Sequence, residues 1–210
     1  LTSKPFRYSA RTWELARRKS VSAHDGLGSN LVVQTKLDRV MRVVPYENES
    51  INECWLSDRD RFAYEGLNTE DRLTRPMVCK DGAWVEVDWP EALEAVANGL
   101  KEVAAKHGPA AIGALVSPTL TLEELHLASK LATGLGTPNV DYHFRALDAR
   151  ARFAGAPWLG MKIAEVGALE SVLLVGGTIR KEQPLLAQRL RQGAKKGLAV
   201  NIVHVADDDL

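Results

Sequence analysis

The pattern of apolar and polar positions in the first third of the chain has the two-residue period of β-strands. The clearest case is a hairpin with strands at 31–35 and 40–44, which Pro45 ends. A looser alternation that includes aromatic residues and Thr predicts another strand at 6–15. Residues 53–67 favour one or two helical turns instead. This part of the chain is therefore expected to be a small β-rich module.

A second hairpin and a long helix are expected next. Residues 72–89 read as two short strands with Asp81-Gly82 at the tip, a dipeptide that favours tight hairpin turns. Asp88 with Glu91 then forms a helix-capping pattern. The helix that follows ends near Gly108, and its apolar residues recur at intervals of three and four: Leu93, Val96, Ala97, Leu100, Val103 and Ala104.

Helices and strands alternate through the rest of the chain. In chain order the pattern predicts a buried strand at 110–117, a helix at 122–136 capped by Thr121 and Glu124, a strand at 139–144, an apolar strand at 171–177, a helix at 184–197 and a last strand at 198–205. A strand, a helix and a strand within about 35 residues form a βαβ unit, which implies a parallel sheet covered on both faces. The expected fold class is α/β, with a β-rich module followed by a partial, open αβα layer.

Composition excludes several classes of function. Lys and Arg together number 27, as do Asp and Glu, so the net charge gives no case for nucleic-acid binding. We expect the basic run 17–19 to be a solvated turn. No apolar run approaches the roughly 20 residues of a membrane helix, and we expect no signal peptide. The two cysteines, Cys54 and Cys79, fit a reducing compartment and are expected to be buried or half-buried thiols.

The loop "SVSAHDGLGSN" has the spacing of a metal-binding loop. Together with one later serine it gives the pattern X-x2-X-x3-X-x27-X, at Ser22, Asp25, Ser29 and Ser57. We call these residues the four ligand positions, because this spacing resembles that of the [4Fe–4S] module at the front of molybdopterin-type oxidoreductases, where all four are Cys. Iron–sulfur clusters require soft thiolate donors, and these side chains offer hard oxygen atoms. We expect no cluster and no other metal here.

No other segment carries a strong chemical signal. Gly176-Gly177 ends an apolar strand where a nucleotide-like ligand could approach, although the pair also suits a plain strand-to-helix turn. The alternating run 58–61 is expected to form surface salt bridges, and 206–209 an acidic loop. No catalytic constellation stands out, so no catalytic residue is assigned. The histidines show no zinc-binding spacing: His24, His107, His126, His143 and His204.

Several segments resemble a known family. "LTSKPFRYSARTWEL", "SNLVVQTKLDRVMRVVP", "INECWLSDRDRFAYEGL" and "RLTRPMV" are similar to the large iron–sulfur subunit of respiratory NADH:quinone oxidoreductase (complex I), which is called the G subunit in bacteria and the 75-kDa subunit in mitochondria. Some bacterial members bind an additional [4Fe–4S] cluster in this module. The present chain resembles the members that do not.

The resemblance implies a domain organisation. Residues 1–14 would connect to an upstream ferredoxin-like domain that carries [2Fe–2S] and [4Fe–4S] clusters. Residues 15–71 would form a 4Fe-4S Mo/W bis-MGD-like module without its cluster ligands. Residues 72–210 would be part of a molybdopterin oxidoreductase-like (Rossmann-like) domain that has lost its cofactor, in a parent chain that continues beyond it.

The resemblance also implies a function. The chain would be a scaffold in an electron-transfer subunit, non-catalytic by itself, with other subunits of the peripheral arm as partners. It would lie on the cytoplasmic face of the bacterial inner membrane, or on the matrix side in mitochondria, without inserting into the membrane. The alternatives are an active molybdopterin oxidoreductase, which would need the missing cysteines, and an unrelated αβ domain, which would leave the shared segments to chance.

Overall fold

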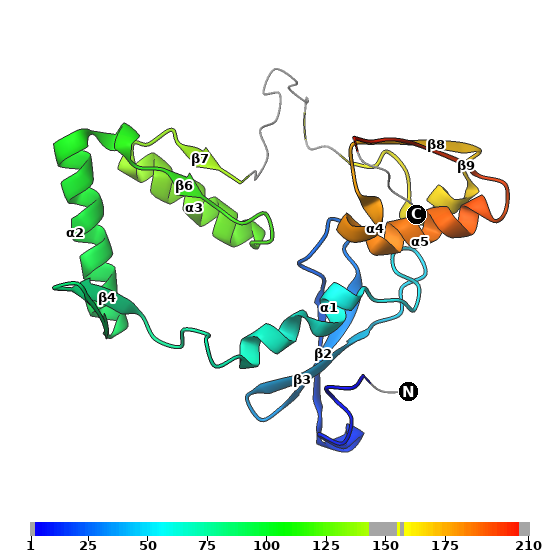
Figure 1. Cartoon of the computed structure of the whole chain (residues 1–210), viewed down its shortest axis with the longest axis horizontal. Coiled ribbons are helices and arrows are strands. Elements are labelled where there is room, and N and C mark those ends of the chain that lie inside the picture. The colour runs from blue at the N-terminus through cyan, green and yellow to red at the C-terminus, as the bar shows by residue number, and fades with distance from the viewer. Residues whose placement is uncertain (1–2, 143–154, 156–157, 206–210) are drawn as a thin grey trace. The chain divides into compact units, whose positions relative to one another are not determined.

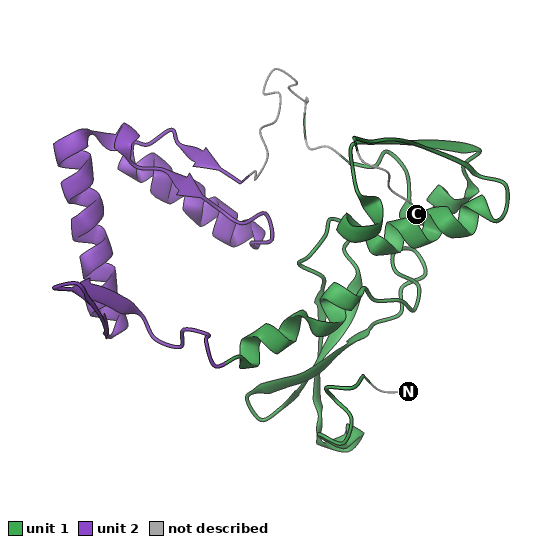
Figure 2. Cartoon of the chain, viewed as in Figure 1, with its two compact units in different colours: residues 1–69, 153–210 green, residues 70–152 purple. Residues whose placement is uncertain are grey.

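The chain forms two compact units, which Figure 2 distinguishes by colour. The computed structural model describes residues 3–142, 155 and 158–205. Unit 1 combines residues 1–69 with 153–210, and unit 2 holds residues 70–152. The β-rich segment and the final βαβ segment therefore share one unit.

Unit 1 contains a three-stranded antiparallel sheet in the order β1-β2-β3 (Figure 1). Its strands are β1 (Ala16–Val21), β2 (Asn30–Lys36) and β3 (Arg39–Pro45). The hairpin between β2 and β3 confirms the strongest strand prediction. Its turn places Leu37 at a φ of 52°.

The start of the chain differs from the prediction. The strand predicted at 6–15 is wrong, because residues 4–9 form turns and Thr12–Glu14 form a 3₁₀ turn. The solvated turn predicted at 17–19 is also wrong, since these residues are the centre of β1. Every side chain of β1 is exposed while its backbone pairs with β2. Charged side chains can therefore extend into water without breaking the strand.

One face of this sheet packs on a short helical segment. The core consists of Leu31, Val43 and Leu56, with Val33, Val40 and Tyr64 packed against it. The helical segment comprises α1 (Asp58–Phe62) and the 3₁₀ turn η2 (Ala63–Asn68), as predicted for residues 53–67. Burying each of the larger aliphatic side chains contributes about 1.5–3 kcal/mol.

The end of unit 1 is the predicted βαβ unit, but the expectation that both faces of its sheet are covered is wrong, because Leu173, Val175 and Val203 are exposed. It contains η4 (Ile163–Ala168), β8 (Ser171–Val175), α4 (Ile179–Glu182), α5 (Pro184–Ala194) and β9 (Ala199–Val203). Strands β8 and β9 are parallel. Their core is Val166, Leu190 and Leu198. Gly193 allows α5 to approach closely, since a Cβ there would lie 2.9 Å from the Gly167 carbonyl oxygen.

Arg189 on α5 joins the two segments of unit 1. Its Nη2 donates hydrogen bonds to the carbonyl oxygens of Glu49 (3.1 Å) and Ile51 (2.9 Å). Its Nη1 lies 3.1 Å from Oε1 of Glu53. All three partners belong to the loop between β3 and α1, which is thereby tied to the βαβ unit.

Unit 2 begins with the second predicted hairpin. Strands β4 (Met77–Lys80) and β5 (Ala83–Glu86) are antiparallel. Asp81 and Gly82 between them both have positive φ, 52° and 82°, as a type I′ turn requires. Helix α2 (Trp89–His107) follows, and its Asp88 cap accepts a hydrogen bond from the Glu91 backbone N–H at 3.0 Å.

The rest of unit 2 is a second, shorter strand–helix–strand segment. It contains η3 (Pro109–Ala111), β6 (Ala114–Leu115), α3 (Leu122–Leu135) and β7 (Val140–Asp141), with β6 and β7 parallel. The capping box of Thr121 and Glu124 is confirmed. The buried strand predicted at 110–117 is shorter than expected, because Pro109 starts a 3₁₀ turn, and it is not buried, because Leu115 is exposed. The last residues of the strand predicted at 139–144, with His143, lie outside the described residues, as does the 206–209 loop.

Candidate functional site

The β1–β2 hairpin places two of the four ligand positions opposite each other. Its strand register ends with Val21 beside Asn30. One step further, the Ser22 backbone N–H donates to the Ser29 carbonyl oxygen at 2.8 Å. Directly opposed residues of an antiparallel pair project from the same face, with Cβ atoms about 4.5–5.5 Å apart. The side chains of Ser22 and Ser29 are therefore neighbours.

A single carboxylate connects Ser22 to Ser57, the last of the four ligand positions. The Ser22 hydroxyl donates to Oδ1 of Asp60 at 2.5 Å, and the Ser57 hydroxyl donates to Oδ2 at 2.8 Å. Ser57 also caps α1, because its Oγ accepts from the Asp60 backbone N–H at 3.1 Å. Asp60 is only 4% exposed. The three residues form a buried cluster that joins the hairpin end to α1.

The position of Asp60 corrects the sequence analysis. The run 58–61 was expected to form surface salt bridges. This is wrong for Asp60, because its carboxylate is buried and accepts hydrogen bonds from two serine hydroxyls. Arg59, the preceding residue in the run, donates to the backbone carbonyls of His24 (3.4 Å) and Lys181 (3.1 Å). The only sequence signal for this arrangement was the cap-like spacing of Ser57 and Asp60, which resembles a capping box.

Ser29 is completely buried, with an exposed fraction of 0%. Its Oγ has no hydrogen-bond partner within the part of the chain that the structure describes. A buried hydroxyl without a partner costs free energy, about 1–3 kcal/mol in mutational data. Ser29 thus adds an unsatisfied polar atom beside the satisfied Ser22–Asp60 pair.

Asp25, the remaining ligand position, lies in the hairpin turn. Its Oδ1 accepts a hydrogen bond from the Leu27 backbone N–H at 3.0 Å. Partial burial raises the pKa of the Asp25 carboxyl, while the Leu27 N–H opposes that shift and the nearby Asp60 charge adds to it. The backbone N–H of half-buried His24 donates to Ser22 Oγ at 3.1 Å. The turn is therefore closed by its own polar groups.

These residues do not fit an iron–sulfur cluster. All four ligand positions carry oxygen, and the hydroxyls of Ser22 and Ser57 are engaged by Asp60. Both cysteines, Cys54 and Cys79, are exposed, so the expectation that they are buried or half-buried is wrong. Among the described residues, no group of three or more His, Cys, Asp or Glu side chains is placed to hold a metal ion.

The Gly176-Gly177 turn connects β8 to α4. Gly176 has a φ of 72°, and its N–H donates to the Val203 carbonyl oxygen at 2.9 Å, which closes the end of the parallel pair. A Cβ on Gly177 would lie 3.4 Å from Oε2 of Glu182. A carboxylate so close to the turn opposes the approach of an anionic, nucleotide-like ligand.

A groove of about 830 Å³ lies between the loop 51–55 and α5 within unit 1. It was not predictable from the sequence, because its walls are far apart in the chain. Its lining includes Glu53 and Arg189, which are already paired with each other. The groove therefore lies where two segments of unit 1 are held together, and it does not present unpaired charge from this pair.

Comparisons with known proteins identify both halves of the chain. Residues 15–65 match the family described as NADH-ubiquinone oxidoreductase NDSU1/NuoG-like, 4Fe-4S domain. Residues 72–207 match the family described as molybdopterin oxidoreductase. A solved structure of acetylene hydratase from Pelobacter acetylenicus is similar with a TM-score of 0.57 and 16% identity, over 87% of this chain and 27% of that one. At this identity the likeness shows the fold alone, and it agrees with the predicted α/β class.

The chain is similar to G subunits of NADH-quinone oxidoreductase. The one from Rickettsia typhi is 35% identical over 97% of this chain and 30% of its own length. The one from Rickettsia felis is 38% identical over 94% of this chain and 29% of its own length. The chain thus spans less than a third of these relatives, and it is homologous to that part of a subunit of an oxidoreductase complex. With a family match over more than half of its residues, the chain belongs to the molybdopterin oxidoreductase family.

Proposed function

We propose that this chain is a structural, non-redox segment of the large iron–sulfur subunit of an NADH:quinone oxidoreductase. The observation that carries the proposal is the arrangement at Asp60. Three of the four ligand positions gather around this carboxylate or beside it, in a chain that aligns over 97% of its length with the G subunit from Rickettsia typhi. The oxygen atoms that stand where thiolates would bind iron are used for hydrogen bonds at Ser22 and Ser57.

The domain organisation follows the resemblance. Residues 1–14 connect to an upstream ferredoxin-like domain with [2Fe–2S] and [4Fe–4S] clusters, which carry the electrons. Residues 15–71 are the module without its cluster, and residues 72–210 are part of the molybdopterin oxidoreductase-like domain. The two family matches, at 15–65 and 72–207, support this division.

The molybdopterin cofactor that the family implies does not fit the described residues. Gly176 and Gly177 are the only glycine pair that the sequence suggests for a nucleotide-like ligand, and Glu182 places a carboxylate beside them. Helix α4, which follows the turn, has only four residues and offers little helix-dipole stabilisation to a phosphate. We therefore assign the αβα part a scaffold role and derive no reaction through it.

The partners follow from the same assignment. The chain holds the electron-carrying upstream domain against other subunits of the peripheral arm. This arm lies on the cytoplasmic face of the bacterial inner membrane, or on the matrix side in mitochondria. Among the described helices, none combines the length and apolar character needed to cross a membrane.

Iron content tests the proposal. The 210-residue chain, incubated anaerobically with iron and sulfide and then desalted, should be colourless and free of stoichiometric iron. A variant with Cys at all four ligand positions serves as the positive control for the reconstitution. Retention by the unchanged chain of about four irons, with the broad absorbance of sulfur-to-iron charge transfer, would contradict the proposal.

A further inference from the structure

The neutral total charge of the chain hides a strongly basic segment. Residues 3–46 contain nine Lys and Arg residues and three Asp and Glu residues, although the whole chain has 27 of each kind. This segment forms the β1-β2-β3 sheet and the turns before it. The positive charge is therefore concentrated on one small part of unit 1.

The register of the sheet gathers part of this charge on one face. Arg17 on β1 pairs with Gln34 on β2, which in turn pairs with Arg42 on β3. These three side chains project from the same face, and Lys19, two residues after Arg17, projects with them. The opposite face carries the apolar residues that pack on Leu56. We call Arg17, Lys19 and Arg42 the basic face.

Arg42 is fixed in position without an acidic partner. Its Nε donates to Oε1 of Gln34 at 2.7 Å, and its guanidinium carbon lies 4.2 Å from the centre of the Phe6 ring. Partial burial lowers the pKa of Arg42, and the neighbouring positive charge of Arg17 lowers it further. Neither arginine forms a salt bridge with any described carboxylate. Two like charges thus lie on the same face of the sheet, on either side of Gln34, with no described carboxylate paired to either.

Lys19 is also held by an aromatic residue. Its Nζ donates to the Tyr46 hydroxyl at 2.7 Å and lies 4.3 Å from the centre of that ring. Strand β1 pairs with β2 alone among the described strands, so its other edge is open. The basic face therefore combines Lys19 and Arg42, each positioned against an aromatic ring, with Arg17 on the edge strand β1. Enrichment in Arg and aromatic residues is typical of protein interfaces.

We propose that the basic face is a docking surface for an acidic surface of another subunit, with a carboxylate received between Arg17 and Arg42. The inference rests on the proposed function, which places the chain in a multisubunit complex, and adds the face and the chemistry of its partner. Guanidinium groups match carboxylates in shape, and an incoming carboxylate relieves the repulsion between the two arginines. Cations held by rings and an amide suit a defined protein contact better than the diffuse attraction of lipid or nucleic acid.

Zero-length cross-linking in the intact complex tests the contact. The full-length parent subunit is purified with its complex and treated with a carbodiimide, which joins lysine amines to carboxylates in direct contact. We expect Lys19 to be joined to an Asp or Glu of another subunit. If Lys19 is cross-linked only to residues of its own subunit, or is not cross-linked at all in an intact complex, the docking proposal is overturned and the proposed function is not affected. Purification of the parent subunit without NADH-oxidising partners would overturn the proposed function and this inference together.

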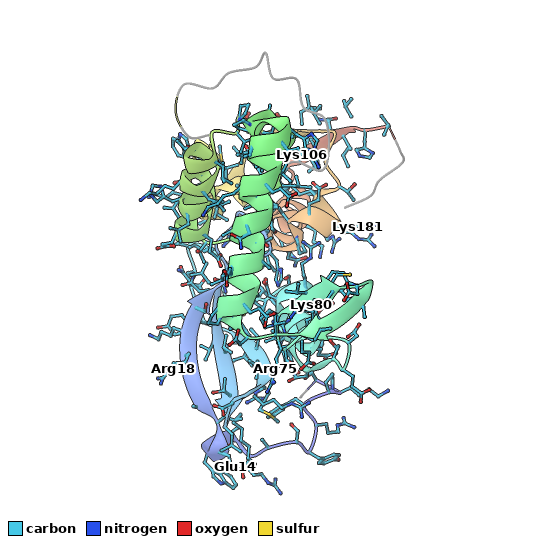
Figure 3. The ribbon with its side chains drawn as sticks, turned by 90° about the vertical axis from the view of Figure 1, so that its left-hand side faces the viewer. Glu14, Arg18, Arg75, Lys80, Lys106 and Lys181 are labelled. Atoms are coloured by element: carbon cyan, nitrogen blue, oxygen red, sulfur yellow. The ribbon has the colours of Figure 1, made fainter. Side chains whose placement is uncertain are left out.

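Charge reversal provides an independent measurement. Arg17→Glu with Arg42→Glu should lower the recovery of assembled complex at moderate salt by at least about tenfold, since rim charges govern association rate and salt dependence. Arg17→Glu alone should lower it in the same direction without disturbing the fold, because every β1 side chain is exposed. Arg18→Glu is the matched control, because Arg18 lies on the same strand and pairs with Val33, so it projects from the opposite face. Figure 3 labels Arg18 beside β1.

The alternative ligands give distinct results. Equal assembly of Arg17→Glu, Arg18→Glu and the unchanged protein would overturn the proposal. Another outcome is that the complex binds phosphatidylglycerol vesicles, and that Arg17→Glu abolishes this binding but leaves assembly unchanged. This result would overturn the docking proposal in favour of a membrane surface. Loss of assembly with Arg17→Glu and not with Arg18→Glu would support it.

Discussion

Two places in unit 1 lie where the family resemblance suggests a cofactor, and a carboxylate lies at each. At the β1–β2 hairpin end, Asp60 is buried and accepts hydrogen bonds from Ser22 and Ser57. At the turn after β8, Glu182 is exposed and its Oε2 lies beside Gly177. The first carboxylate connects two elements of the fold, whereas the second occupies space near a turn that the backbone closes by itself. The two carboxylates therefore have different structural roles.

Asp60→Ala should have the largest effect. It removes the acceptor for two buried hydroxyls and the connection between the hairpin end and α1, at an expected cost of about 2–4 kcal/mol. Amide hydrogen exchange in β2, measured at increasing urea concentrations, reports the stability of this part of the molecule separately from the rest. Asp58→Ala is the matched control, because Asp58 is exposed in the same helical turn and should cost less than about 1 kcal/mol. Equal costs for the two variants would show that the cluster does not connect the elements.

At the glycine turn, Gly176→Ala should cost more than Gly177→Ala. Gly176 has a φ of 72°, and the left-handed conformation costs a residue with a Cβ about 1–2 kcal/mol. A Cβ on Gly177 meets only the end of the flexible Glu182 side chain, so that variant should stay within about 0.5 kcal/mol. Amide hydrogen exchange in β8 measures the loss of stability in both variants. The reverse order would mean that the space beside Gly177 matters more than the backbone conformation.

Ser29→Ala should stabilise the hairpin end slightly. The hydroxyl is buried and has no partner among the described residues, so its removal should gain about 1 kcal/mol. The same exchange experiment on β2 detects the change. Destabilisation by a similar amount would indicate that a water molecule or another group satisfies this hydroxyl.

The smallest effect concerns Asp25 and pH. Its folded-state pKa is raised, chiefly by burial, so the stability that it contributes is present below its ordinary pKa and is lost as pH rises through the folded value. Asp25→Asn keeps an acceptor for the Leu27 N–H and removes this loss. The variant should match the unchanged chain at about pH 3 and exceed it at about pH 7, by less than about 1 kcal/mol because the group is only partly buried. If the free energies of unfolding of the variant and of the unchanged chain differ by the same amount at every pH in this range, the raised pKa of Asp25 is contradicted.

Locally determined features were predictable from the sequence. The hairpin at β2–β3, the Asp81-Gly82 turn and the caps of α2 and α3 depend on residues within a few positions of one another. The parallel pairing of β8 and β9 follows from the βαβ pattern as well. In each case the periodicity, the turn chemistry and the capping residues agree, which makes such elements readable without tertiary information.

Features determined by distant contacts were not predictable. Asp60 lies in a charged run that is typical of a surface, and its burial depends in part on a hydrogen bond from the Ser22 hydroxyl, 38 residues earlier. Strand β1 reads as a solvated turn because its side chains are charged, and its pairing with β2 supplies the backbone hydrogen bonds that periodicity cannot reveal. Of the four ligand positions, the spacing identified the residues but not the carboxylate that joins two of them.

The connection through Arg189 has a consequence for the order of folding. The β2–β3 hairpin joins residues that are close in sequence, so it can form as soon as it leaves the ribosome. The loop after β3 is fixed by a side chain 138–140 residues later in the chain. Contacts of such high sequence separation form late, because the entropy of closing the intervening chain must be lost first. We therefore expect the contacts of Arg189 with Glu49, Ile51 and Glu53 to form only after α5 has emerged, although the hydrogen bonds from residues 51–53 to the Asn48 carbonyl oxygen can form earlier.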